Sequence, residues 1–295
     1  MARLVRAAAE DAGFHAAGVA SVASFRDVAG RLGLRGRRSD LQAALPGAKS
    51  AIVVALSYLY PRSEIRDPGS PRGLVARFAR GTDYHSVLQS RLQTLAGGLC
   101  DVLGEFRFRV CVDTGPISDR AVAYAAGLGS FGRNTCLITP GYGSWVVLGE
   151  LVTDVELEPN EPREPEVCGS CCLCVEACPT GALRGDFTLD RSRCLSDATQ
   201  RRAAPPPDLT EHWGNRIYGC DVCQEVCPLN AGARLTDVPE FSTDNALGAE
   251  PELAMLAEMT EEDFDRLFAG TAMRRLGRGL IARNAGLAMS SFSDL

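Results

Sequence analysis

The sequence predicts an α+β protein with a cysteine-rich cofactor domain and a helical C-terminal segment. Patterns typical of helices and strands alternate over roughly the first half of the chain. Nine of the twelve cysteines then fall between positions 168 and 227. After Asn230 the apolar residues follow helical spacing. We therefore expect a mixed domain over residues 1–160, a cysteine-rich domain over 161–235 and a helical segment over 236–295.

Composition and charge narrow the class of protein. The chain has 295 residues, 45% of them hydrophobic, which allows one large or two modest globular domains. No apolar run approaches the ~20 residues of a membrane span, and Arg3 and Arg6 interrupt the stretch where a signal peptide is apolar. The net charge of −6 gives no overall basic surface for nucleic acid. We expect a cytoplasmic protein that does not bind membranes.

The first elements are a helix, a buried strand and a second helix. Residues 1–14 are patterned as a short amphipathic helix. Residues 51–60 are rich in β-branched residues and form a buried strand by length and composition. A polar, proline-containing loop over 63–72 follows. A helix then opens after Gly81, capped by Thr82 or Asp83, and runs to about Leu99.

Two more strands and a helix complete the first domain. Residues 106–112 alternate in polarity as a half-buried strand does, and the strand ends in a turn at 113–116. Ser118 caps a helix that Gly127 stops. Residues 145–157 form the last strand.

The run from Gly127 to Gly132 matches G-x-G-x-x-G, but its position argues against a dinucleotide site. Such a site needs the glycines directly after a strand and at the start of a helix. Here they follow a predicted helix. We interpret them as a tight loop that lets backbone approach a neighbouring segment.

A linker rich in proline and glutamate, residues 158–166, separates the first domain from the cysteines. Three helices are expected near the end of the chain, over residues 251–258, 261–268 and 272–290. The chain shows no internal repeat beyond two cysteine half-motifs.

The cysteine spacing indicates two [4Fe-4S] clusters of the bacterial-ferredoxin kind. Without Cys172, the run from Cys168 to Pro179 reads C-x2-C-x2-C-x3-C-P. A second run, C-x2-C-x3-C-P, ends at Pro228. Three thiolates spaced by two residues let a tight loop wrap one cluster, while the fourth cysteine of the run serves the other cluster.

Crossing the ligands in this way assigns four cysteines to each cluster. Cluster 1 takes Cys168, Cys171, Cys174 and Cys227. Cluster 2 takes Cys178, Cys220, Cys223 and one further thiolate, which we assign to Cys194. Cys172 is then a spare thiol, although it could substitute for Cys171 with a less suitable spacing.

Zinc and disulfides are the alternatives to clusters. Zinc sites use paired C-x2-C knuckles, which differ from a triple run followed by Cys-Pro. Disulfides suit small secreted domains rather than a chain of this length without a secretory signal. Both alternatives are therefore disfavoured.

Two clusters in series transfer single electrons at low potential and seldom carry out bond chemistry themselves. The first domain must then hold the group that is reduced or dock an electron partner. With only three histidines, His15, His85 and His212, a multi-histidine metal site is not expected. Asp113 is the best acid candidate because it lies at a strand end beside a Gly-Pro turn. Its carboxylate could equally do no more than cap that turn.

At this point the chain resembles the epoxyqueuosine reductase family, which is related to reductive dehalogenases. The resemblance covers most of the chain, and the cysteine array with Cys194 in its middle is its most specific part. The other matching segments are LPGAKSAIVV from Leu45, ARGTDYH from Ala79, DTGP from Asp113, AGLGSFGRNT from Ala126, and Arg283-Asn284.

The resemblance implies a cobalamin enzyme. The first domain would hold cobalamin with its own base displaced (base-off), in a nitroreductase-like α/β fold. The clusters would deliver electrons to it. The family's reaction removes the epoxide oxygen of epoxyqueuosine at the tRNA wobble position, giving queuosine and water, a two-electron and two-proton reduction that ends queuosine biosynthesis.

Residues that match the family's functional positions are expected to contact cofactor and substrate. Asp113 matches the proton donor, and burial beside an apolar corrin would raise its pKa and keep it protonated. Arg201 could contact either cobalamin or a tRNA phosphate. The expected cobalamin contacts are Ala79, Asp113, Asn134, Leu137, Leu148, Ser196 and Arg201.

Two departures from the family pattern bear on the substrate. The family usually has Gly-Trp-Ile-Gly-Lys where this chain has Gly129-Ser-Phe-Gly-Arg133. Many members also continue into a helical-repeat domain that helps grip tRNA, and this sequence stops at Leu295. Contacts with tRNA phosphates would then depend on local arginine clusters.

Two other functions stay open on the sequence alone. The chain could be a cobalamin-dependent reductase of another substrate, such as an organohalide, or an electron-transfer module that docks a partner reductase. A relay needs far less chain than the residues before the clusters, which argues against the module. In each case we expect a monomer that receives electrons from a low-potential donor such as flavodoxin or ferredoxin.

Overall fold

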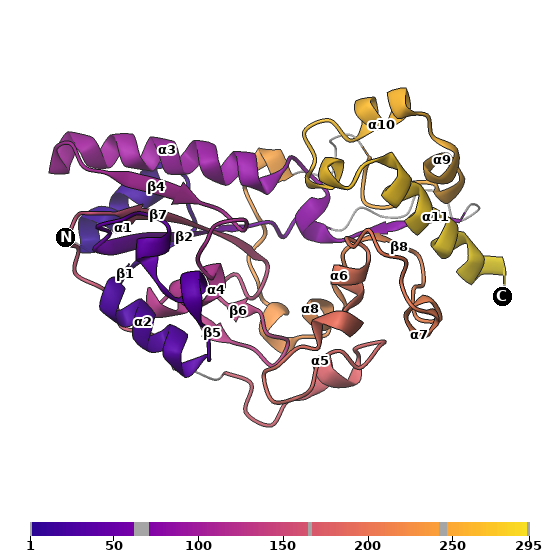
Figure 1. Ribbon diagram of the computed structural model, residues 1–295, viewed down its shortest axis with the longest axis horizontal. Coiled ribbons are helices and arrows are strands. Elements are labelled where there is room, and N and C mark those ends of the chain that lie inside the picture. Colours follow the sequence, from indigo (N-terminus) through magenta and orange to yellow (C-terminus); the bar gives the residue numbers. More distant parts are fainter. Residues whose placement is uncertain (1, 62–70, 165–166, 242–246, 294–295) are drawn as a thin grey trace.

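The computed structural model describes residues 2–61, 71–164, 167–241 and 247–293. Most of the polar loop predicted over 63–72 lies outside these residues. Figure 1 shows a sheet with its helices at one end of the molecule and the C-terminal helices at the other, with the cysteine-bearing segments below and between them. Within the described residues no helix is both long and apolar enough to span a membrane.

The first half of the chain contains a four-stranded antiparallel sheet with strand order β1-β2-β7-β4. Its strands are β1 (Ala16–Ser21), β2 (Ser50–Ser57), β4 (Phe108–Cys111) and β7 (Val146–Thr153). All eight residues of β2 are buried because the strand lies inside the sheet and helices cover both faces. Glu150 of β7 lies directly between Val53 and Cys111 of the neighbouring strands.

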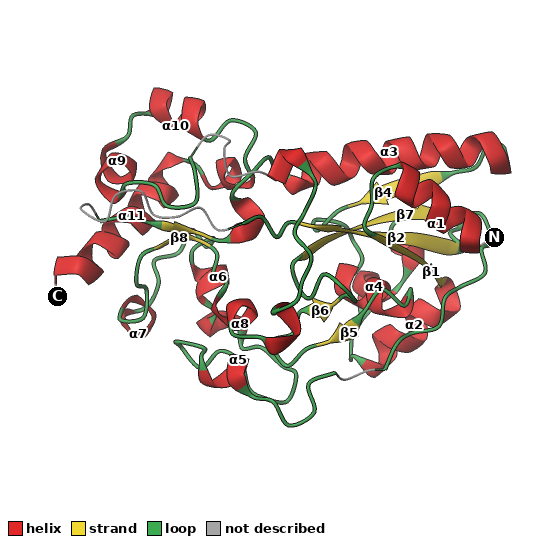
Figure 2. Cartoon of the chain, turned by 180° about the vertical axis from the view of Figure 1, so that it is seen from behind, coloured by secondary structure: helices red, strands yellow, loops and turns green. Residues whose placement is uncertain are grey.

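Two helices cover each face of the sheet, as Figure 2 shows. Helices α1 (Ala2–Asp11) and α3 (Tyr84–Leu103) pack on one face, where Leu88, Leu92 and Leu95 of α3 are buried. Helices α2 (Val22–Arg31) and α4 (Asp119–Ala125) pack on the other face with a second apolar core. The sheet thus buries apolar side chains on both faces, which explains the almost continuous apolar run of β2.

The cysteine-rich region is built on single-turn helices, and the short strand pairs and 3-10 turns are spread along the chain. The helices are α5 (Leu173–Glu176), α6 (Leu195–Ala198), α7 (Pro207–Thr210) and α8 (Val222–Glu225). Strands β3 (Leu74–Val75) and β8 (Arg216–Tyr218) pair in parallel, and β5 (Ser130–Phe131) pairs with β6 (Leu137–Ile138). The 3-10 turns are η1 Gly36–Ser39, η2 Leu41–Ala43, η3 Arg77–Ala79, η4 Arg191–Arg193, η5 Pro228–Asn230, η6 Pro239–Phe241 and η7 Ala272–Leu276.

Helices α9 (Leu253–Glu258), α10 (Glu261–Leu267) and α11 (Arg278–Ser293) form a third core rather than a loose tail. They pack around Trp213 and Tyr218, which are both fully buried. Asn284 of α11 donates hydrogen bonds to the carbonyls of Thr199 and Ile217, each at 2.8 Å. The C-terminal helices are therefore tied into the cysteine-rich region.

Most predicted elements of the first domain are present. Asp83 caps α3 by accepting from the N–H of His85, and Gly127 ends α4 with a positive φ of 72°. The glycine loop allows close backbone approach as predicted, because a Cβ at Gly129 would lie 2.4 Å from the carbonyl oxygen of Ile138. The prediction of one helix over 272–290 is wrong, since Gly277, with φ 76°, separates η7 from α11. Strand β1 and helix α2 were not predicted.

Candidate functional site

Asp113 lies on the loop between β4 and α4, at the end of the sheet where strand and helix meet. Its backbone takes a left-handed conformation, with φ 49°. Aspartate tolerates this region better than most residues because its short side chain can bond locally. The side chain is 57% exposed and faces a cavity. The loop thus presents a carboxyl group to an open space instead of only capping a turn.

The cavity at Asp113, of about 280 Å³, is lined by residues from segments far apart in the chain. Three aromatic side chains, Tyr58, Phe78 and Tyr84, line it together with the apolar residues of β7. Phe78 contacts both Tyr58 and Tyr84 edge-on, with ring centroids 6.5 and 6.2 Å apart. The remaining lining residues are Arg38, Ser118, Asp119, Arg120, Val146, Val147 and Leu148.

His85 links Asp113 to the start of α3. Its Nε2 lies 3.5 Å from Oδ2 of Asp113, and its Nδ1 lies 2.7 Å from Oδ1 of Asp83. The imidazole also stacks on Tyr84, with centroids 4.1 Å apart. The imidazole is therefore fixed between two carboxyl groups, of which one faces the cavity.

This arrangement places the ionisable proton of the pair on the histidine. The neighbouring carboxylate of Asp113, and then that of Asp83, raise the pKa of His85 to about 9, against a smaller opposing effect of burial. The neighbouring imidazole of His85 is also the main cause that lowers the pKa of Asp113. In the chain by itself the pKa of Asp113 is therefore lowered, because a histidine lies beside the carboxyl group; the predicted rise concerns Asp113 beside a bound corrin and stays a prediction.

The four cysteines predicted for cluster 1 line one small cavity. Cys168, Cys171, Cys174 and Cys227 surround a space of about 130 Å³. The backbone N–H of Arg133 donates to Sγ of Cys168 at 3.3 Å, a contact that stabilises a thiolate. Within the described part of the chain, no group of three or more His, Cys, Asp or Glu side chains is arranged to hold a single metal ion. Thiols spread around a cavity suit a multi-atom cluster.

The four cysteines predicted for cluster 2 also influence one another. Burial raises the pKa of Cys194, and the nearby thiolates of Cys220 and Cys178 raise it further. Burial likewise raises the pKa of Cys223, with added repulsion from Cys220 and Cys194. Arg216 donates from Nε to Sγ of Cys220 at 3.4 Å. Iron bonded to these sulfurs would remove the cost of bringing thiolates together.

Tyr58 connects the second cysteine set to the cavity at Asp113. It lines that cavity and donates from its hydroxyl to Oε1 of Gln224 at 3.2 Å, next to Cys223 in the chain. Burial raises the pKa of Tyr58, and the charges of Asp221, Cys136 and Cys223 add to the effect. Cluster 2 would thus lie closer to the cavity than cluster 1.

The structure brings some of the predicted cobalamin contacts together and separates others. Asp113 and Leu148 line the same cavity. Asn134 instead lines the cluster 1 cavity, and its Nδ2 donates to the carbonyl of Cys223 at 3.4 Å. Ala79 and Leu137 are buried in two different apolar cores.

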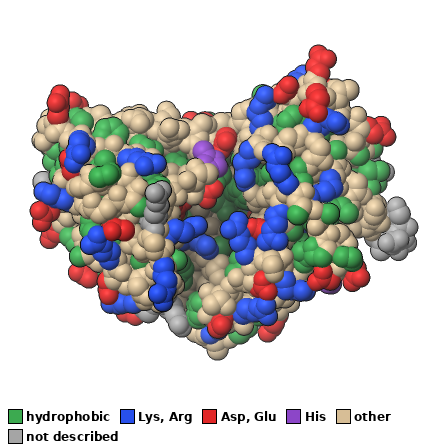
Figure 3. All heavy atoms as spheres, viewed as in Figure 1, with side chains coloured by type: hydrophobic (Ala, Val, Ile, Leu, Met, Phe, Trp, Pro, Cys, Tyr) green, Lys and Arg blue, Asp and Glu red, His purple; other side chains and the backbone are tan. Residues whose placement is uncertain are grey.

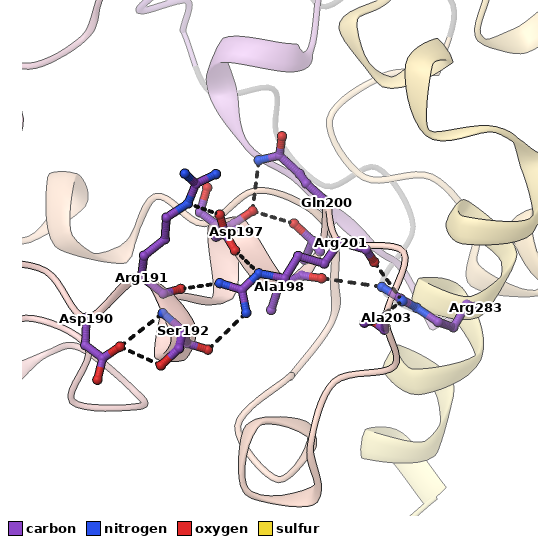
Figure 4. A network of polar contacts seen from close by, with 11 residues as sticks. Asp190, Arg191, Ser192, Asp197, Ala198, Gln200, Arg201, Ala203 and Arg283 are labelled. Atoms are coloured by element: carbon purple, nitrogen blue, oxygen red, sulfur yellow. Dashed lines mark hydrogen bonds and ion pairs between the residues drawn. The ribbon is translucent and has the colours of Figure 1, made fainter. Parts of the chain in front are cut away.

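Figure 4 shows Arg201 in a polar network in the segment that follows Cys194, and the carbonyl of Ser196 accepts a hydrogen bond from Gln200 of the same network at 2.9 Å. The guanidinium of Arg201 pairs with Asp197 and donates to the carbonyl of Arg191 at 2.7 Å. Arg283 of α11 donates to the carbonyl of Arg201 at 2.9 Å. The network holds the segment after Cys194 in place, and the Arg201 side chain stays 39% exposed.

The face drawn in Figure 3 is hollowed in the middle, and Lys and Arg side chains gather around the hollow. Arg275, in the C-terminal helical unit, donates to the hydroxyl of Tyr218 at 2.7 Å and contacts Gln200. The positive charge of Arg275 also lowers the pKa of Asp113, as a minor contribution after that of His85. Arg275 is therefore within electrostatic reach of the cavity.

Sequence reasoning missed several residues of this site. Tyr58 and Tyr84 carry no local signal of a cavity, since each is one aromatic residue at the end of a strand or the start of a helix. The adjacency of His85 to a predicted cap at Asp83 was a usable signal, because a capping carboxylate often bonds a neighbouring polar side chain. The pairing with Asp113 required the fold.

Comparisons with known proteins agree with the geometry. Residues 38–114 match the family described as "Epoxyqueuosine reductase QueG, DUF1730". An epoxyqueuosine reductase of Bacillus cereus is 40% identical over 260 residues, which cover 88% of this chain and 68% of the relative. The chain belongs to the epoxyqueuosine reductase family. Residues 167–230 match the 4Fe-4S double cluster binding domain. Epoxyqueuosine reductases are oxidoreductases.

Solved structures of epoxyqueuosine reductases share the fold. One, determined with an epoxyqueuosine-modified tRNA-Tyr stem loop, has a TM-score of 0.88 at 35% identity and covers 99% of this chain and 81% of its own. Another, from Bacillus subtilis, has its catalytic aspartate loop swung out of the active site, with a TM-score of 0.87, 34% identity and the same coverage. The predicted α+β class is confirmed by these matches.

Proposed function

We propose that this chain is an epoxyqueuosine reductase that converts epoxyqueuosine to queuosine at the wobble position of tRNA. The reaction opens both C–O bonds of the epoxide with two electrons and two protons, and it releases the oxygen as water. The chain's own contribution is then to deliver protons to the leaving oxygen and to hold the carriers that deliver electrons. Both tasks have candidate residues at one cavity.

One observation carries the proposal: Tyr58, which lines the cavity at Asp113, bonds Gln224, the residue next to Cys223 of the second cysteine set. Asp113 faces this cavity from the β4–α4 loop. Tyr58 lines it too and reaches toward the segment of Cys223. A reduction coupled to protonation needs a proton source and an electron source at one place. The relatives named epoxyqueuosine reductases give the chemistry that such a site would perform.

The residues present suit cobalamin as the group that holds electrons at the cavity. The space at Asp113 is smaller than a corrin, but it shares Ser118 and Arg120 with a cleft of about 1110 Å³. Cofactor pockets commonly occupy about 300–1,000 Å³. Tyr58, Phe78 and Leu148 offer apolar surface for a flat macrocycle. When bound, cobalamin would supply low-potential electrons to the substrate. We also propose that the first domain, which would hold it, has a nitroreductase-like fold.

Asp113 and His85 act as one proton-donating unit in this proposal. At neutral pH the shared proton resides mainly on His85, whose pKa is about 9. A substrate that fills the cavity would displace water from Asp113, and desolvation shifts the proton toward the carboxyl group. Asp113 can then donate to the leaving oxygen, while His85 restores its proton. Water in the cavity would weaken this coupling, so filling the cavity is part of the mechanism.

Electrons would enter at cluster 1 and reach the cavity through cluster 2. Cys223 of the second set lies near Tyr58 in the cavity wall. The first set lies nearer the surface, where four apolar side chains around it are 36–48% exposed: Val167, Leu173, Val226 and Leu229. We propose that a low-potential donor such as flavodoxin or ferredoxin approaches this side. The chain is proposed to work as a monomer.

Substrate binding in this proposal relies on arginines of the C-terminal helical unit and of the network that follows Cys194. Phosphate contacts position a nucleic acid without reading its sequence. Arg275 and Arg278 come from the C-terminal helical unit, and Arg201 and Arg191 come from the network that follows Cys194. Binding to tRNA should therefore weaken steeply as salt rises, in proportion to the number of phosphates contacted.

The test is conversion of a stem loop that carries epoxyqueuosine. The protein is purified without oxygen, loaded with cobalamin and reduced chemically, and the nucleosides are quantified after digestion. The proposal expects queuosine to appear with the wild type. Absence of queuosine despite full iron and cobalt content would contradict it and favour another substrate, such as an organohalide. Full iron content without retained cobalt would favour an electron-transfer module.

A further inference from the structure

Glu150 is a buried carboxyl group that no part of the site described above uses. It lies in the middle of β7 with 0% of its surface exposed. Within the described chain, neither of its carboxyl oxygens has a hydrogen-bond partner. Burying an unpaired carboxyl group is costly, and a stable fold would more easily place an apolar residue here. We therefore expect Glu150 to have a role that offsets this cost.

Its side chain points to the face of the sheet that carries α4. Residues 146, 148, 150 and 152 of β7 alternate with residues that pack against α3, and Leu148 and Val152 belong to the core beneath α2 and α4. Leu148, two residues along on the same face, lines the cavity at Asp113. Glu150 therefore lies one pleat deeper than the cavity wall.

Asp119, the first residue of α4, is the second unusual carboxyl group here. It lines the cavity, and its Oδ1 is also buried without a partner among the described residues. The backbone of Asp113 lies beside this carboxyl group and helps to lower its pKa, against the larger effect of burial. Asp119 is thus placed to hold the backbone of the residue that the proposed mechanism uses as proton donor.

We propose that Glu150 and Asp119 form a buried acid pair, bridged by an ordered water, that fixes the position of the Asp113 loop. Glu150 is the neutral, hydrogen-bond-donating member and Asp119 is the accepting member. Both are positioning residues, since they act through the backbone of Asp113. The proposed pairing of Glu150 with Asp119 does not depend on the proposed function, whereas its effect on catalysis rests on that function.

The unsatisfied atoms themselves indicate the water. Three buried oxygens, two from Glu150 and one from Asp119, lie on facing elements. A buried water typically makes about three hydrogen bonds and is found where several polar groups lack partners. A water between these oxygens would satisfy all three atoms, provided that Glu150 carries a proton to donate. The pair would then be fully bonded, as buried polar groups generally are.

The surrounding charges agree with this division of roles. Burial, with repulsion from Asp119 and Asp113, raises the pKa of Glu150 well above its ordinary range. Burial and the charge of Asp113 raise the pKa of Asp119 to about 6, while Arg38 has a small opposing effect. From β4, the thiol of Cys111 faces the same space, and Arg109 is the nearest cation on that strand. Asp119 therefore ionises near neutral pH, and Glu150 does not.

A loop of this kind needs an anchor. In the Bacillus subtilis epoxyqueuosine reductase structure, the catalytic aspartate loop is swung out of the active site. Asp113 of this chain holds a left-handed conformation that costs free energy unless neighbouring groups fix it. The Asp119 carboxyl group, which lies beside this backbone, can act as such a constraint. Misplacing a catalytic group by about 1 Å can cost on the order of 10²-fold in rate.

The experiment compares two substitutions at Glu150 with a control on the same strand. Glu150→Leu removes the polar group at similar size, Glu150→Gln keeps hydrogen bonding, and Val152→Ala perturbs the same apolar face without touching the pair. For each variant, amide hydrogen exchange is measured over the Asp113 loop, together with the unfolding midpoint and kcat. The infrared spectrum reports the carbonyl stretch of a protonated carboxylic acid.

We expect Glu150→Leu to keep or raise the unfolding midpoint, to speed amide exchange in the Asp113 loop, and to lower kcat on the order of 10²-fold with little change in KM. Glu150→Gln should restore most of the amide protection and of kcat, and it should remove the protonated-acid band. Val152→Ala should lower the unfolding midpoint and leave exchange in the loop unchanged.

Unchanged loop exchange in a folded Glu150→Leu variant would overturn the proposal. So would an infrared band that persists in Glu150→Gln. If Glu150→Leu fails to fold, the exchange and infrared results of Glu150→Gln and of Asp119→Asn decide. Exchange and infrared spectra need no substrate, so a failure of the proposed function would appear as inactive wild type with the predicted spectra intact.

Discussion

The cysteine-rich region and the cavity at Asp113 are built on opposite principles. The cysteines lie on single-turn helices, such as α5 and α8, that bury little apolar surface of their own. The cavity is instead set by a sheet with apolar cores on both faces, so its walls are fixed before any ligand binds. One region would depend on its metal for order, and the other would not. Removing metal should therefore disorder the turns that carry the cysteines and spare the sheet.

The largest expected effect comes from the cluster ligands. Cys220→Ser should lower the iron content from about eight to about four per chain and abolish reduction at the cavity. Cys172→Ser is the matched control, since Cys172 is predicted to be a spare thiol. Iron content is measured by chemical analysis and the clusters by their visible absorption. Loss of iron in Cys172→Ser but not in Cys171→Ser would show that the ligand assignment at this position is wrong.

His85→Gln tests the cavity at Asp113, the region whose walls are fixed before a ligand binds. The variant keeps the direct donor, Asp113, and loses the group that restores its proton, so kcat should fall on the order of tenfold. In the wild type, kcat should decline as pH rises through about 9, where His85 loses its proton. That decline should be absent in the variant. A wild-type profile that stays flat through pH 9 would remove His85 from the mechanism.

Asn284→Ala tests how the C-terminal helices join the cysteine-rich region. Two buried carbonyls, those of Thr199 and Ile217, would lose their donors. Leaving them unsatisfied should lower the free energy of unfolding by about 2 kcal/mol. Urea unfolding measures the change, and Ser290→Ala, which removes a hydroxyl bonded only within α11, is the control. An unchanged midpoint would mean that these helices are not anchored at this point.

The smallest expected effect is a pH-dependent contribution of Asp119 to folding stability. Its pKa is about 6 in the folded protein, above the ordinary value of 3.8. The folded state therefore binds more protons, and stability from this group is lost as pH rises from about 4 through 6. Asp119→Asn should remove that loss, so its stability relative to wild type should increase across this window. Parallel stability curves for the two proteins would contradict the raised pKa.

The two regions also differ in how far the sequence alone predicts them. Cysteine spacing is local information, so Cys168, Cys171 and Cys174 could be grouped before any fold was known, and the structure places them around one cavity with Cys227. The acid at Asp113 could be proposed from its place after a strand. His85 and Glu150 could not, because their roles depend on which strand end meets which helix. A residue's pKa depends on such neighbours, and the effect of His85 on the pKa of Asp113 could not be read from the sequence.

The central claim is that Asp113 donates protons at a cavity that the clusters supply with electrons. The most direct test is a single turnover of an epoxyqueuosine stem loop by wild type and Asp113→Asn, each with iron and cobalt quantified in the same sample. We predict about eight irons and one cobalt per chain in both proteins, with queuosine formed on the order of 10²–10⁴-fold more slowly by the variant. Wild-type turnover by a fully loaded Asp113→Asn protein would contradict the account.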